Sequence, residues 1–173
     1  MIKQKNKIGI LGGSFDPAHK GHLAISREAA KRFKLKKVVW AITKKNPFKK
    51  KSNTSLLTRI RKCKKIIGKN SHIKVKFYEN IIKSNKTINL INHFAKNKTN
   101  EIYFLMGADN LINFHKWHKW ETISKKCNII VFDRHGYKKK SLNSITFKRL
   151  NEKSLKFINF NKVNISSSQL RKI

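Results

Sequence analysis

Short apolar runs alternate with stretches of helical periodicity along most of this chain. Apolar runs predict buried strands at residues 7–11, 38–43, 102–106 and 128–132, and period-two alternation predicts a half-buried strand at 73–77. Apolar residues at helical spacing predict helices over 21–34 and 55–67 and a further helix from residue 87. We expect a loop at 79–85 and a last strand at 157–160, whereas the basic stretch 138–150 has too little periodicity to predict an element.

The order of these elements favours one fold class. Strands that alternate with helices predict an α/β protein with a Rossmann-like, doubly wound parallel sheet and helices on both of its faces. A chain of 173 residues suits one domain, so we expect residues 1–173 to form it. In such a sheet the first and fourth strands flank the crevice where ligands bind, beyond the carboxyl ends of the strands.

The segment after the first strand carries the first candidate site. Its sequence is GGSFDPAHKGH, residues 12–22, and it leads from two glycines into the first helix. Backbone N–H groups and a helix N-terminus there would face the same space, which suits a phosphate, although an ordinary strand-to-helix turn is the alternative. His19 and His22 are three residues apart and can share a helix face. No cysteine or third histidine lies nearby at metal-ligand spacing, so we predict no protein-held metal.

Two further segments follow in positions where ligands bind. Asp109 comes just after the fourth strand, and its carboxylate could cap the next helix or accept a hydrogen bond from a ribose hydroxyl. Trp117 and Trp120 come next, and such a pair either packs in the core or forms a stacking platform. In the tail, Ser168 and Arg171 could converge on an anion, while flexible or helix-capping serines are the alternative.

The whole string GGSFDPAHKGHL resembles the signature of nucleotidyltransferases with an HxGH motif, with His19, Gly21 and His22 in its fixed positions. GADNL at 107–111 and FHKWHKWE at 114–121 make the chain similar to the bacterial nicotinate-nucleotide adenylyltransferases. This resemblance implies transfer of AMP from ATP to nicotinate mononucleotide, giving nicotinate adenine dinucleotide and pyrophosphate in NAD biosynthesis. Pantetheine-phosphate adenylyltransferases share HxGH, but their tail motif usually ends in lysine where this chain has Arg171.

The resemblance also implies roles for individual residues. His19 and His22 would be catalytic and would contact the α- and β-phosphates. Ser168 replaces the usual threonine of the tail motif, and Asn89 replaces an aspartate. The residues expected to bind ATP are the two histidines together with Gly12, Gly13, Ser14, Phe15, Gly21, Ser167, Ser168 and Arg171. Those expected to bind nicotinate mononucleotide are Asp16, Lys45, Asn46, Thr87, Gly107, Asp109, Trp117 and Arg134. Mg²⁺ would be carried by ATP, because the sequence has no carboxylate cluster to hold it.

The composition adds a second functional hypothesis. The formal net charge is +34, from 42 Lys and Arg against 8 Asp and Glu. A basic RNA-binding protein on an inactive scaffold would explain this charge, but lysine is spread along the whole chain and only seven arginines are present. We therefore expect small-molecule substrates and no specific nucleic acid.

Other features of the sequence concern its setting. No apolar run is long enough to span a bilayer, so no membrane partner is expected. Cys63 and Cys127 are far apart, which favours a reduced, cytoplasmic setting. Cys63 lies on the apolar stripe of its helix and is expected to pack in the core. The oligomeric state stays open, a homo-oligomer included.

Overall fold

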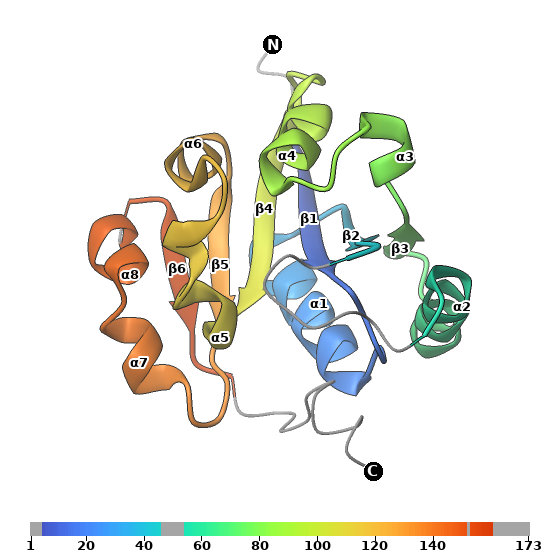
Figure 1. The fold of residues 1–173 in the computed structure, drawn as a ribbon, viewed down its shortest axis with the longest axis horizontal. Coiled ribbons are helices and arrows are strands. Elements are labelled where there is room, and N and C mark those ends of the chain that lie inside the picture. Colours follow the sequence, from blue (N-terminus) through green and yellow to red (C-terminus); the bar gives the residue numbers. More distant parts are fainter. Residues whose placement is uncertain (1–4, 46–53, 152, 161–173) are drawn as a thin grey trace.

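The computed structural model describes residues 5–45, 54–151 and 153–160, which form a six-stranded parallel sheet with helices on both faces. The strand order is β3-β2-β1-β4-β5-β6, and every pairing is parallel (Figure 1). The strands are β1 (Asn6–Gly13), β2 (Lys37–Ile42), β3 (Ile73–Lys76), β4 (Asn100–Gly107), β5 (Asn128–Phe132) and β6 (Leu155–Ile158). The order reverses between β1 and β4, which confirms the doubly wound sheet and places its topological switch point between these two strands.

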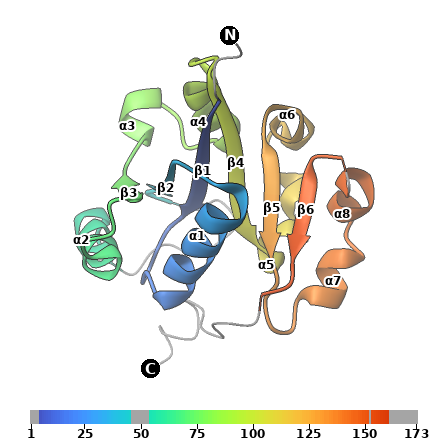
Figure 2. The same cartoon turned by 180° about the vertical axis from the view of Figure 1, so that it is seen from behind.

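Two apolar clusters, one on each face, hold the helices against this sheet. The longer helices α1 (Lys20–Phe33) and α2 (Leu56–Ile67) pack on one face, with Ala29 and Cys63 fully buried there. The other face is covered by α4 (Thr87–Ala95), α6 (Trp120–Lys126) and α8 (Ile145–Leu150) (Figures 1 and 2). Shorter elements complete the connections: α3 (Glu79–Ile82), α5 (Ala108–Leu111), the 3₁₀ turn η1 (Phe114–Lys116) and α7 (Lys138–Leu142). No helix among the described residues is long and apolar enough to cross a membrane.

Strand β1 lies in the middle of the sheet and is covered on both sides. Ile8 and Ile10 face the cluster under α4, whereas Leu11 faces the cluster under α1. A Cβ at Gly9 would lie 2.9 Å from a methyl carbon of Leu35. Glycine at this position therefore lets the turn after α1 pack directly on the strand.

Some sequence expectations were wrong at the element level. Residues 79–85 are not entirely a loop, because Glu79–Ile82 form the short helix α3. The last strand is Leu155–Ile158 instead of 157–160, and Phe160 packs beyond the strand end, edge-on to Phe132. The unassigned stretch 138–150 contains α7 and α8. Helix α4 begins at Thr87 as expected, but the N-cap is Lys86 and no side chain caps the helix.

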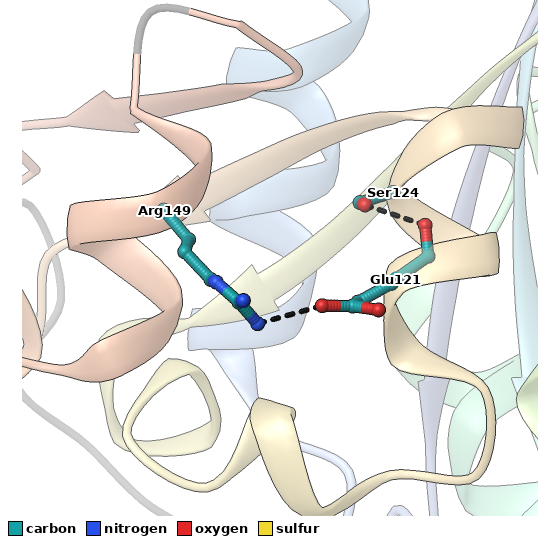
Figure 3. A network of polar contacts seen from close by, with 3 residues as sticks. All are labelled: Glu121, Ser124 and Arg149. Carbon is teal, nitrogen blue, oxygen red and sulfur yellow. Dashed lines mark hydrogen bonds and ion pairs between the residues drawn. The ribbon is translucent and has the colours of Figure 1, made fainter.

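An ion pair joins α6 to α8 at the surface. Arg149 Nη1 lies 2.6 Å from Glu121 Oε1, and Ser124 donates a hydrogen bond to the Glu121 carbonyl (Figure 3). The Arg149 and Glu121 side chains are 64% and 57% exposed. Exposed pairs of this kind contribute about 0–1 kcal/mol, so the packing of the two helices on the sheet rests on apolar burial.

Candidate active site

The two histidines form the N-terminal cap of α1, at the end of β1. His19 is the N-cap residue: its Nδ1 accepts a hydrogen bond from the Gly21 N–H, at 3.1 Å. His22 Nδ1 in turn accepts from the His19 N–H, at 3.2 Å. A neutral imidazole whose Nδ1 accepts must carry its hydrogen on Nε2. The cap therefore fixes both rings, whose centroids are 3.8 Å apart, as Nε2–H donors.

Two buried aromatic rings and one hydroxyl support His22 from behind. Phe15 stacks on Trp40, with centroids 5.0 Å apart and planes 15° from parallel, and lies 4.8 Å from the His22 ring. Trp40 is 0% exposed, and its Nε1–H donates to Ser26 Oγ at 2.8 Å. Ser26 Oγ–H donates to the His22 carbonyl at 2.7 Å. The position of the His22 ring thus depends on a residue of β2.

Asp109 lies just beyond the end of β4, the strand that pairs with β1. Its Oδ2 accepts from Arg134 Nη1 at 2.5 Å, so the residue joins the ends of β4 and β5 instead of capping α5. The other oxygen, Oδ1, is shielded from solvent and has no hydrogen-bond partner among the described residues. A Cβ at Gly107 would lie 2.6 Å from Oδ1. Glycine at 107 therefore makes room for this carboxylate to fold back over the strand end.

Arg59 was not predicted, and it joins the loops that follow β1 and β2. Although it is charged, it is only 2% exposed. Its guanidinium donates to the carbonyls of Ser14 at 2.7 Å, Thr43 at 2.8 Å and Lys44 at 3.2 Å. The sequence did carry a signal: Arg59 lies three residues after Leu56 and four before the buried Cys63, which places it on the inward stripe of α2.

The remaining predicted residues are placed as follows. Asp16 is buried and accepts from the Thr54 hydroxyl at 2.7 Å. Lys45 is exposed at the end of the β2 loop, and Thr87 is half-buried at the start of α4. Trp117 is half-buried and packs edge-on to Phe104. The predicted residues Asn46, Ser167, Ser168 and Arg171 lie outside the described residues.

Gly12 and Gly13 are the last two residues of β1, and Ser14 is the first residue after the strand. Gly13 still belongs to the sheet, since its carbonyl accepts from the Thr43 N–H at 2.9 Å. Ser14 is half-buried, and Gly12 is exposed. The predicted phosphate-binding residues of this segment therefore lie beside the cap of α1.

The cysteines and the acidic groups in the described part of the chain bear on two other kinds of chemistry, thiol reactivity and metal binding. Burial raises the pKa of the Cys63 and Cys127 thiols from 9.0 to about 12, so both are protonated packing residues near neutral pH. No group of three or more His, Cys, Asp or Glu side chains among the described residues could hold a metal ion.

Comparison with known proteins agrees with this geometry. Residues 10–173 match the model of the family described as "Cytidylyltransferase-like". A Pelagibacter ubique protein named "Probable nicotinate-nucleotide adenylyltransferase" is 67% identical over 171 residues, covering 99% of this chain and 95% of the relative. The chain belongs to the nicotinate-nucleotide adenylyltransferase family. It is accordingly a nucleotidyltransferase.

Solved structures support the fold of this family member. Nicotinic acid mononucleotide adenylyltransferase from Plasmodium falciparum, complexed with NaAD, has a TM-score of 0.78 at 23% identity. The same enzyme complexed with APC has a TM-score of 0.77, also at 23% identity. Each comparison covers 96% of this chain and 83% of the other.

Proposed function

We propose that this enzyme transfers the adenylyl group of ATP to nicotinate mononucleotide, giving nicotinate adenine dinucleotide and pyrophosphate. The observation that carries the proposal is the adjacency of β1 and β4: the two capping histidines and Asp109 lie beyond the carboxyl ends of neighbouring strands, where doubly wound sheets bind their ligands. The names of the relatives favour the same pair of substrates.

The nucleophile in this reaction is the phosphate of the mononucleotide. With a second pKa of about 6, it is already largely ionised at neutral pH, so no general base is required. One of its oxygens forms a bond to the α-phosphorus of ATP, while the bond from that phosphorus to the oxygen bridging the α- and β-phosphates breaks and pyrophosphate leaves. The protein therefore has to bring two anions together and stabilise the charge that grows on the phosphates.

The histidines suit this task as neutral donors. Their Nδ1 atoms are occupied as acceptors in the cap of α1, so each can present an Nε2–H to a phosphate oxygen. We assign His19 to the α-phosphate and His22 to the β-phosphate. The positive end of the α1 dipole adds to the attraction for phosphate at this position. Gly12, Gly13, Ser14, Phe15 and Gly21 would surround the phosphates of ATP.

The opposite side of the crevice suits the mononucleotide. Asp109 Oδ1 lacks a hydrogen-bond partner among the described residues, and a ribose hydroxyl would supply one. Arg134 is engaged with Asp109, so we propose that it holds this carboxylate in place beside the substrate. Trp117 would stack on the pyridine ring, and Thr87 would contact its carboxylate. Asp16, Lys45, Asn46 and Gly107 complete the proposed mononucleotide site.

Two further elements of the proposal lie partly outside the described residues. Ser167, Ser168 and Arg171 would bind the leaving phosphates. Mg²⁺ would enter with ATP, because Asp16 and Asp109 already have Thr54 and Arg134 as partners and the described residues offer no carboxylate cluster. The ion would help to neutralise the phosphate charge. The two free, buried cysteines fit a reduced cytoplasmic setting.

The proposal is tested by pyrophosphate release from ATP with nicotinate mononucleotide, nicotinamide mononucleotide and phosphopantetheine in parallel. We expect a strong preference for the nicotinate compound. Activity with phosphopantetheine alone would retain the fold and mechanism but contradict the roles of Trp117 and Asp109.

No activity with any substrate would favour the polyanion-binding alternative suggested by the net charge of +34. Filter binding to RNA over a range of salt concentrations distinguishes it, since purely Coulombic binding falls steeply as salt rises.

A further inference from the structure

The buried guanidinium of Arg59 lies beneath both loops of the proposed site. Every acceptor that the structure gives it among the described residues is a backbone carbonyl: Ser14 after β1, Thr43 and Lys44 after β2, and Thr54 before α2. Burying a cation whose partners are neutral carbonyls lowers the stability of the fold, because the charge loses its hydration. The arrangement therefore calls for a reason beyond the packing of α2.

We propose that Arg59 is a positioning residue for the transfer reaction: it keeps the carbonyl oxygens of the β1 and β2 loops away from the anionic substrates, leaves the Phe15 N–H available to them, and fixes the separation of the two loops. The inference rests on the proposed function, because it assumes that these loops bind ATP and the mononucleotide.

The orientation follows from the planarity of the peptide bond. In a trans peptide, the C=O and the following N–H point in opposite directions. Because Arg59 takes the Ser14 carbonyl, the Phe15 N–H points away from the guanidinium, and it has no acceptor among the described residues. Without Arg59, the Ser14 peptide could turn its oxygen toward the phosphates, which would repel them.

The β2 loop is held from two sides, so its Lys44 N–H is bonded within the protein and the loop is fixed in place. Arg59 takes the Thr43 carbonyl, and the opposite end of that peptide, the Lys44 N–H, donates to Glu79 Oε1 at 3.3 Å. The Thr43 hydroxyl donates to the same carboxylate oxygen at 2.5 Å. One peptide is thus held between a cation from α2 and an anion from α3.

The shared guanidinium also sets the separation of the two loops. Its Nη1 bonds to Ser14 and Thr43 together, at 2.7 and 2.8 Å. Lysine has one compact ammonium group and cannot reproduce this planar fork. Arg59→Lys therefore keeps the charge and removes the geometry, whereas Arg59→Met removes both. Arg61 lies two residues along the same helix and is exposed, so Arg61→Met is the matched control.

The experiment measures kcat, the KM of each substrate and thermal unfolding for these variants. We expect Arg59→Lys to fold, to raise both KM values and to lower kcat/KM by about 100-fold, the scale of loss caused by small misplacements of reacting groups. Arg61→Met should match the wild type. In Arg59→Ala, guanidinium at sub-denaturing concentration should restore part of the activity, and sodium chloride at equal ionic strength should not.

The outcomes separate the inference from the proposed function. If Arg59→Lys keeps kcat/KM within threefold of wild type while His22→Ala is inactive, the positioning role is wrong and the proposed function stands. A lowered kcat at unchanged KM, in proportion to the folded fraction and insensitive to guanidinium, would also overturn it, since that is the behaviour of a purely structural residue. A wild-type enzyme inactive on both mononucleotides would instead refute the proposed function.

Discussion

The hydroxyl of Ser26 gives the sharpest test of how the site is supported. Ser26→Ala removes the acceptor of the Trp40 Nε1–H, and the Trp40 side chain is fully buried. A buried donor left without an acceptor costs about 1–3 kcal/mol. Alanine is a better helix former than serine and returns about 0.5 kcal/mol. We therefore expect a net loss of about 1.5 kcal/mol, or about 3–6 °C in Tm for a chain of this length.

The matched background is Trp40→Phe, which lacks the indole N–H. There the serine has no donor to satisfy, so Ser26→Ala should change stability by less than about 0.5 kcal/mol. Urea unfolding of the four proteins forms a double-mutant cycle, with an expected coupling of about 1–2 kcal/mol. If Ser26→Ala costs the same in both backgrounds, or nothing in either, the hydroxyl is not the partner of the indole and the support for His22 has been misassigned.

Three further outcomes are expected. His22→Ala should lower turnover by about 100-fold or more, with an unchanged circular dichroism spectrum, because a donor to the transition-state charge is lost; near-normal turnover would exclude the catalytic role. Asp109→Asn should raise the KM for nicotinate mononucleotide by about 10-fold through loss of a charged hydrogen-bond acceptor, whereas Glu121→Gln in the exposed pair should not change it. Burial raises the pKa of Cys63 and Cys127 from 9.0 to about 12. The unfolded chain releases these protons at lower pH than the native one does, so stability should fall as pH rises from about 9 toward 12. A Cys63→Ala/Cys127→Ala double variant should lose less Tm between pH 8 and 10 than wild type, and equal losses would contradict the assignment.

The strand order and its switch point were predictable because they follow from local pattern and handedness. Apolar runs identified the central strands, and right-handed crossovers leave few ways to connect them. The HxGH string then placed His19 and His22 at the start of α1. Sequence reasoning succeeded where a few neighbouring residues decide the structure.

The hydrogen bonds that hold the loops of the candidate site were harder to predict, because they join segments that are far apart in the sequence. Arg59 lies on the inward stripe of α2, yet the carbonyls that satisfy it come from residues 45 and 16 positions earlier. Helix α3 is only four residues long and lacks a side-chain cap, and its Glu79 is held by Thr43 from the end of β2. The pattern of apolar residues within one segment does not predict hydrogen bonds to a distant segment.

The edges of the sheet bear on how copies of this protein behave at high concentration. Both outer strands, β3 and β6, are four residues long and carry exposed lysines at 74, 76 and 156. A second molecule adding its own strand to either edge would bring lysine against lysine, within a chain of net charge +34. Fibril-like growth by edge-to-edge strand addition is therefore disfavoured, and this charge also keeps the protein colloidally dispersed.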